Sequence, residues 1–152
     1  KGILDEGDSD HSIYWTEKGI PCRARLDRLS ADRRIILDLK TTTNAEPNAF
    51  IRQITNLAYD VQQDFYTRAV KAEYGRVAEF VFLAVETEAP YATSLVALGP
   101  QMKEIASKKV DYALSIWAAC TRSGQWRGYS NQIHYAEPNP WDAARWLETE
   151  EA

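Results

Sequence analysis

The sequence has few of the residues from which metal–thiolate, disulfide or covalent sites are built. Its two cysteines, Cys22 and Cys120, lie far apart and form no CxxC pair, so they predict buried thiols rather than a disulfide or a zinc site. His11 and His134 lack ligand spacing to each other or to a cysteine. The chain also has no phosphate-cradling glycine-rich loop and no nucleophile elbow. These absences argue against zinc, P-loop and serine-hydrolase chemistry.

Long apolar runs are absent as well. No run approaches the length needed to span a bilayer, and no signal peptide is visible. At 152 residues, with 45% hydrophobic and 26% charged residues, the chain is typical of one globular domain over 1–152. It begins at Lys1 rather than Met, which favours a fragment. We expect a cytoplasmic protein without a membrane segment.

The net charge is −4, which at first argues against a polyanionic partner. The charge is unevenly distributed, however: the first ten residues carry four acidic side chains against Lys1, and the last five carry three glutamates. The central segment 22–43 is instead locally basic and contains Arg23, Arg25, Arg28, Arg33, Arg34 and Lys40. A basic sheet in an acidic chain can still bind a phosphate backbone.

Segment 22–43 alternates as two strands joined by a polar turn. Arg23, Arg25 and Asp27 are expected on one face of the first strand. In the second strand we expect Asp38 and Lys40 on one face, and Ile35, Leu37 and Leu39 on the other, pointing into the core. Folding this hairpin brings Asp27 beside Asp38 and Lys40.

The pattern along the chain predicts a mixed sheet covered by helices, an α/β fold of the α+β mixed-sheet type. Phe50, Ile54, Leu57, Val61 and Phe65 recur at three- and four-residue steps and predict one helix that ends before Gly75. The expected elements are a loop over 1–10, strands over 12–16, 20–29 and 34–41, a long helix over 49–74, strands over 77–86 and 91–98, a second long helix over 100–122 and a short helix over 141–150.

Two carboxylates and an ammonium group on one sheet face have two interpretations. Hard cations such as Mg²⁺ bind oxygen and are often held by one or two carboxylates plus substrate phosphates. A neighbouring lysine can then orient the attacking water. The alternative is a ladder of opposite charges across a hairpin, which contributes only to stability.

The order of motifs resembles the PD-(D/E)XK nuclease superfamily. Asp27, Asp38 and Lys40 form a D-x10-D-x-K signature on consecutive strands, and the next helix bears Q-x3-Y at Gln62 and Tyr66. Within the superfamily the chain is similar to the phage-type recombination exonucleases of the RecE (exonuclease VIII) and lambda exonuclease group. The phrases that carry this resemblance are SIYWTEKGIPCRARLDRL, IILDLKTT, YDVQQDFYTRAV, EFVFLAVET, GQWRGYS and PNPW. It implies a restriction-endonuclease-like core.

The resemblance also implies roles for individual residues. Asp27 corresponds to the first metal-binding aspartate, Asp38 to the second acidic residue and Lys40 to the catalytic lysine. The carbonyl of Leu39 would join the metal ligands. Mg²⁺ is the expected ion, and Mn²⁺ is expected to substitute for it.

Gln62 and Tyr66 match the element that positions the lysine, the water and the DNA phosphate. A further carboxylate often precedes the first strand in such relatives, and Asp10 lies at about that place. Asp8 or His11 could align there instead.

By the same resemblance we expect a metal-dependent exonuclease that acts 5′→3′ on linear duplex DNA. Its expected partners are double-stranded DNA ends, a single-strand-annealing protein and further copies of itself in a homo-oligomer. The host would be a bacterial or phage-infected cell. Such exonucleases carry helices upstream of the segment that this chain matches, so we expect the chain to be either shortened at its N-terminus or an unusually compact relative.

Several alternatives stay open. The core could serve an endonuclease or a RecB-like repair nuclease, or a non-catalytic DNA-binding module. Arg23 and Arg25 could grip the DNA backbone or only shield the acidic cluster. Trp126, Tyr129 and Trp141 could stack on DNA, but packing of the C-terminal segment onto the domain is the favoured expectation.

Overall fold

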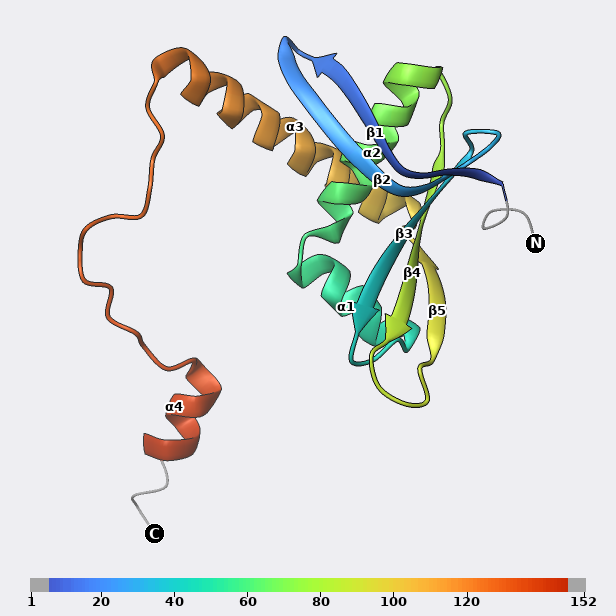
Figure 1. Ribbon diagram of the computed structural model, residues 1–152. Coiled ribbons are helices and arrows are strands. Elements are labelled where there is room, and N and C mark those ends of the chain that lie inside the picture. The colour runs from blue at the N-terminus through green and yellow to red at the C-terminus, as the bar shows by residue number, and fades with distance from the viewer. Residues whose placement is uncertain (1–5, 148–152) are drawn as a thin grey trace.

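A computed structural model describes residues 6–147 of the chain. Its centre is one five-stranded sheet in the order β1-β2-β3-β4-β5, in which only β3 and β4 run parallel (Figure 1). The elements are β1 (Gly7–Glu17), β2 (Ile20–Ser30), β3 (Ile35–Thr42), α1 (Pro47–Asn56), α2 (Tyr59–Tyr74), β4 (Glu79–Glu86), β5 (Thr93–Ala97), α3 (Pro100–Ser123) and α4 (Pro140–Leu147). The predicted mixed sheet with helices packed on it is confirmed.

The core lies between the sheet and the helices. Helices α1 and α2 form the crossover that returns the chain from β3 to β4 as a parallel neighbour. Fully buried side chains from strands and helices meet in this layer: Leu26, Leu29, Ile36, Phe50, Ile54, Val70, Phe80 and Phe82. No helix in the described range is long and apolar enough to cross a membrane.

The first strand is longer than predicted. β1 begins at Gly7, inside the predicted loop 1–10, and pairs with β2 from Gly7↔Ser30 to Glu17↔Ile20. Strand β1 can begin at Gly7 because this residue has no side chain. Its φ is 130°, and a Cβ there would clash with the carbonyl oxygen of Leu29 at 2.2 Å. The polar side chains that suggested a loop are held by arginines of β2 and of the turn after it, in the pairs Arg33–Asp8, Arg28–Ser9 and Arg25–Asp10. Residues 1–5 of that predicted loop lie outside the described range.

The predicted helix over 49–74 is two helices, not one. α1 ends at Asn56, and α2 starts at Tyr59 after Ala58 adopts a left-handed conformation with φ 55°. Leu57 is 57% exposed and leaves the apolar stripe. The apolar periodicity did not predict this break between α1 and α2, because the apolar side chains of the two helices pack against different clusters.

Each half of that stripe has its own partners. Phe50 and Ile54 pack in the main core under β3 and β4. Val61 and Phe65 pack instead against a second cluster of Ile20, Cys22, Val110 and Leu114, between the β1–β2 hairpin and α3. The break therefore allows consecutive helical segments to serve two packing surfaces.

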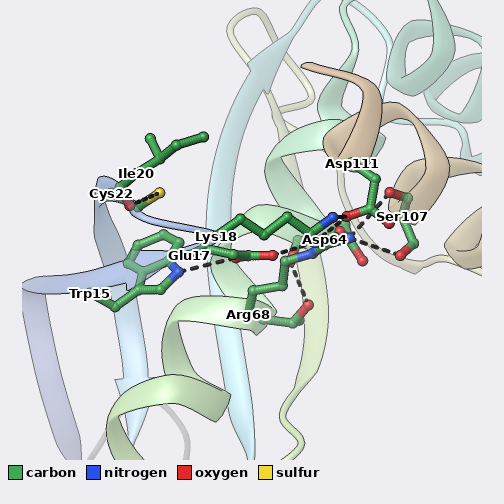
Figure 2. A network of polar contacts seen from close by, with 10 residues as sticks. Trp15, Glu17, Lys18, Ile20, Cys22, Asp64, Arg68, Ser107 and Asp111 are labelled. Atoms are coloured by element: carbon green, nitrogen blue, oxygen red, sulfur yellow. Dashed lines mark hydrogen bonds and ion pairs between the residues drawn. The ribbon is translucent and has the colours of Figure 1, made fainter. Parts of the chain in front are cut away.

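An arginine on α2 fastens the hairpin and the helices together (Figure 2). The Arg68 guanidinium donates to Glu17 at the end of β1 (2.5 Å), to Asp64 on α2 (2.6 Å) and to Asp111 on α3 (2.9 Å). Burial lowers the pKa of Arg68, but the hydrogen bonds to its three carboxylate partners outweigh this effect and raise it. Burial raises the pKa of Asp64, although Arg68 opposes that shift.

The C-terminal segment does not pack onto the domain as predicted. Trp126 contacts Trp117 on α3, with ring centroids 5.1 Å apart. Tyr129 and Trp141 are exposed, and α4 has no buried residue. In Figure 1 this segment runs away from α3 and places α4 apart from the sheet. The part of the predicted final helix beyond residue 147 lies outside the described range.

Replacing Ala58 by glycine should stabilise the protein. Glycine adopts the left-handed conformation without the steric cost that alanine bears, so Ala58→Gly is expected to raise the free energy of unfolding by about 0.5–1 kcal/mol. Urea unfolding measures the change. The control Ala119→Gly, at an exposed site inside α3, should lower stability by about 1 kcal/mol. Equal losses at both positions would contradict the assigned break.

Removing Arg68 should cost more than removing an exposed partner in the same network. Arg68→Met leaves three carboxylates without their shared cation, and we expect a loss of about 2 kcal/mol at pH 7. The loss should shrink as the pH falls, because the Asp64 carboxyl, whose pKa burial raises, then binds a proton and no longer needs the cation. Lys18→Met removes only the exposed pair with Asp111 and should change stability by less than about 1 kcal/mol. A loss independent of pH would show that Arg68 acts by packing alone.

Candidate active site

The site is built on β3, and its acidic residue faces the helices. Asp38 is 1% exposed, whereas Leu39 is 51% exposed. Alternation correctly puts Asp38 and Lys40 on one face, but the prediction that Leu39 points into the core is wrong. β3 is flanked by β2 and β4 and covered by helices on the Asp38 face. A polar residue can lie there because α2 supplies it with a hydrogen-bond partner.

Two donors hold the Asp38 carboxylate. Gln62 Nε2 on α2 donates to Oδ1 at 2.8 Å, and Lys40 Nζ donates to Oδ2. Burial raises the pKa of Asp38, and the hydrogen bond and charge of Lys40 oppose that shift. The negative charge of Asp27 raises the Asp38 pKa further. The two aspartates are therefore close enough to repel each other.

Asp27 reaches the site because β2 and β3 separate at this point. Their ladder contains only Arg28↔Leu37 and Leu29↔Ile36. Beyond Arg28↔Leu37, the Asp27 carboxylate accepts a hydrogen bond from the backbone N–H of Leu39 at 2.9 Å. The structure thus brings Asp27, Asp38, the backbone of Leu39, Lys40 and Gln62 together, and the last four come from β3 and α2.

Tyr66 lies one turn beyond Gln62 on α2, and its ring packs against Phe80 with centroids 6.2 Å apart. Its side chain is half-buried against the main core. The catalytic role that the resemblance implies for Tyr66 stays a prediction.

The predicted third acidic ligand lies across the β1–β2 ladder from Asp27 but is paired with an arginine. Asp10 is exposed and pairs with Arg25 at 2.7 Å. The two alternatives also have other partners, since Asp8 pairs with Arg33 and His11 Nε2 hydrogen-bonds the Tyr74 hydroxyl at 2.8 Å. The structure places none of the three against Asp38, so a metal-binding role for Asp10 stays a prediction.

Arg23 and Arg25 share the exposed face of β2 with Asp27, as the alternation predicts. The pairing of Arg25 with Asp10 agrees with the shielding alternative for that residue. Contact of either arginine with DNA stays a prediction.

One residue that contacts the catalytic lysine candidate was missed. Lys40 Nζ lies 4.8 Å from the centroid of the Tyr59 ring, which in turn packs against Phe82 and Phe50. Tyr59 stands three residues before Gln62, and this spacing puts both on one side of a helix. That signal was available in the sequence, but only the position of the break brings the ring over Lys40.

The donor atoms at this site suit a hard divalent cation. Two carboxylates and a backbone carbonyl offer oxygen ligands, and Mg²⁺ needs only one or two carboxylates when a substrate phosphate completes its shell. Within residues 6–147 there is no group of three or more His, Cys, Asp and Glu side chains arranged for a metal ion. The site therefore fits an ion that binds with its substrate better than a preformed structural metal centre.

The sequence matches a known family over residues 1–139, described as a PDDEXK-like domain of unknown function (DUF3799). The chain belongs to this family. Its membership confirms the predicted PD-(D/E)XK superfamily and the restriction-endonuclease-like fold. The narrower resemblance to the RecE and lambda exonuclease group stays a prediction.

One solved structure agrees with this assignment at the level of the fold. A protein from Eubacterium rectale, named as a candidate exonuclease, superposes with a TM-score of 0.68 at 13% identity over 90% of this chain. The chain spans 56% of the length of that protein. The protein SSO0001 aligns over 96% of this chain and 59% of its own, at 12% identity and a TM-score of 0.44. No curated protein sequence matches.

The contact between Tyr59 and Lys40 can be tested by NMR. The aromatic ring should shift the Lys40 side-chain protons upfield, and this shift should persist in Tyr59→Phe and disappear in Tyr59→Leu. Tyr112→Leu, an exposed tyrosine on α3, is the matched control. Identical Lys40 shifts in all variants would contradict the contact.

Proposed function

We propose that this domain is a metal-dependent deoxyribonuclease that hydrolyses phosphodiester bonds at the ends of linear duplex DNA. One observation carries the proposal: the buried Asp38 carboxylate contacts both Lys40 and Gln62, and Asp27 lies beside them. A structural ladder of charges does not require a carboxylate to be buried at the centre of the sheet. Desolvation makes such burial costly in free energy, and buried carboxylates with a perturbed pKa are common at functional sites.

Each residue has a distinct task in this mechanism. Asp27, Asp38 and the Leu39 carbonyl would hold Mg²⁺ or Mn²⁺, and the ion would supply a polarised phosphate and a more acidic bound water. Lys40 leaves its contact with Asp38 to orient that water and to offset the charge that develops on the phosphate. Gln62 keeps one Asp38 oxygen fixed, so that the other points towards the ion.

Hydrolysis then follows from this arrangement. The water oxygen bonds to phosphorus as the P–O bond to the leaving nucleotide breaks. The attacking water gives up a proton to solvent, and the leaving oxygen takes up a proton from solvent. Action on ends rather than within the duplex draws support from the name of the E. rectale neighbour and from the resemblance to recombination exonucleases. A 5′→3′ direction, a single-strand-annealing partner, a homo-oligomer and a cytoplasmic location belong to the same proposal.

The decisive experiment is a digestion of end-labelled linear duplex with and without Mg²⁺. Lys40→Ala should lower the rate at least about 100-fold, because it removes a charge that acts in the transition state. Binding of Mg²⁺, measured by calorimetry, should persist because both carboxylates remain. Lys103→Ala removes a lysine that pairs with Glu79 on the surface and should leave the rate unchanged.

Three results would change the assignment. Equal rates for Lys40→Ala and the parent protein would remove Lys40 from the mechanism. Cleavage of closed-circular duplex at the same rate as linear duplex would indicate an endonuclease. DNA binding without metal-dependent turnover would indicate a non-catalytic binding module.

A further inference from the structure

The first turn of α2 carries two side chains of the candidate active site. Gln62 donates a hydrogen bond to Asp38, and the ring of Tyr59 lies against the Lys40 ammonium group. Tyr59 follows directly after Ala58, the left-handed residue at which the chain turns from α1 into α2. The position of both side chains therefore depends on how this turn is held.

The start of α2 lacks a side-chain cap. Ala58 occupies the N-cap position and makes no side-chain hydrogen bond, although the first N–H groups of a helix have no partner within the helix itself. Val61 adds apolar packing against the cluster that includes Val110 and Leu114 of α3, but the hydrophobic effect is non-directional. A helix that begins in this way needs a directional contact to fix its first turn.

An ion pair with α3 supplies a contact of this kind. Lys109 Nζ on α3 donates to Oδ2 of Asp60, which lies between Tyr59 and Gln62 in the sequence. The Asp60 side chain is 4% exposed, and that of Lys109 is 42% exposed. Among the residues that the structure describes, this is the one ion pair made by the first turn of α2. A charge-assisted hydrogen bond is strong and directional, so it fixes this turn relative to α3.

Stability alone explains this pair poorly. Burial removes water from the Asp60 carboxylate, and its second oxygen, Oδ1, has no hydrogen-bond partner within residues 6–147. A buried ion pair that is only partly satisfied often contributes no net stability, because the cost of desolvation offsets the attraction between the charges. Apolar side chains of similar size would fill the same place at least as well. What the pair provides beyond stability is a fixed position of α2 relative to α3.

A second junction holds α3 in place as a support for this contact. Arg68, further along α2, donates to Asp111 and to Ser107 of α3 (Figure 2). These two residues stand two positions after and two positions before Lys109. The helices are therefore joined both at the first turn of α2 and beyond it. Loss of the Asp60 contact should shift the first turn without separating the two helices.

We propose that Asp60 and Lys109 are positioning residues, whose ion pair holds the first turn of α2 where Tyr59 and Gln62 can make their contacts with the candidate active site. Both residues act through α2 rather than on the substrate. Their effect on turnover rests on the proposed nuclease function, whereas their effect on the position of Tyr59 does not.

A double variant separates positioning from stability. Asp60→Leu combined with Lys109→Met replaces the ion pair by apolar side chains, and the urea midpoint of unfolding should stay unchanged or rise. The Lys40 side-chain protons should nevertheless lose most of the upfield NMR shift that the Tyr59 ring causes. On linear duplex DNA with Mg²⁺, kcat should fall at least about tenfold, because displaced groups slow the chemical step. KM should stay unchanged.

Single variants of α3 lysines supply the controls, and they decide the matter if the double variant does not fold. Lys109→Arg keeps a cationic donor for Asp60 and should show the parental Lys40 shift and kcat, whereas Lys109→Met should lower both. Lys103→Met breaks the pair that another lysine of α3 makes with Glu79 on the surface and should change neither.

The proposal is overturned if the folded double variant keeps the parental Lys40 shift and kcat, or if KM rises while kcat stays the same. It is also overturned if Lys109→Arg loses as much as Lys109→Met, or if Lys103→Met has the same effect as either. A parent protein that digests no DNA would refute the proposed nuclease function, and the Lys40 shift alone would then decide the positioning role.

Discussion

The buried carboxylate of Asp38 is the constraint on which the arrangement of this protein depends. A charge at the centre of a sheet is costly unless donors surround it, and here one donor comes from the same strand and one from a helix. Gln62 can supply its hydrogen bond only because α2 places its side chain against Asp38 of β3. The same burial raises the pKa of Asp38, because it disfavours the charged carboxylate. A cation bound at the site would stabilise that charged form.

The break between α1 and α2 serves this constraint. A single straight helix could not pack Phe50 in the main core and Phe65 against the second cluster while placing Gln62 on Asp38. The left-handed residue Ala58 reorients the chain within one residue. Tyr59 then begins α2 over Lys40, so the break shapes both the core and the candidate site.

Much of the fold was predictable because apolar periodicity reports burial directly. The order of strands and helices and the pairing of the hairpin follow from it, and so does the shared face of Asp38 and Lys40. The prediction failed where polarity had another cause. Asp8 and Asp10 suggested a loop, yet Asp8 pairs with Arg33 in the turn after β2 and Asp10 pairs with Arg25 on β2. Apolar character also misled, since Leu39 suggested a core residue and is 51% exposed.

The sequence by itself determined the chemical groups and their order along the chain, since the D-x10-D-x-K and Q-x3-Y spacings fall on strands and a helix that local patterns specify. Tertiary structure decided which sheet face the helices cover, where β2 separates from β3, and which aromatic ring meets Lys40. These features depend on contacts between segments distant in the chain, and a periodic pattern of burial carries no information about which surface covers it.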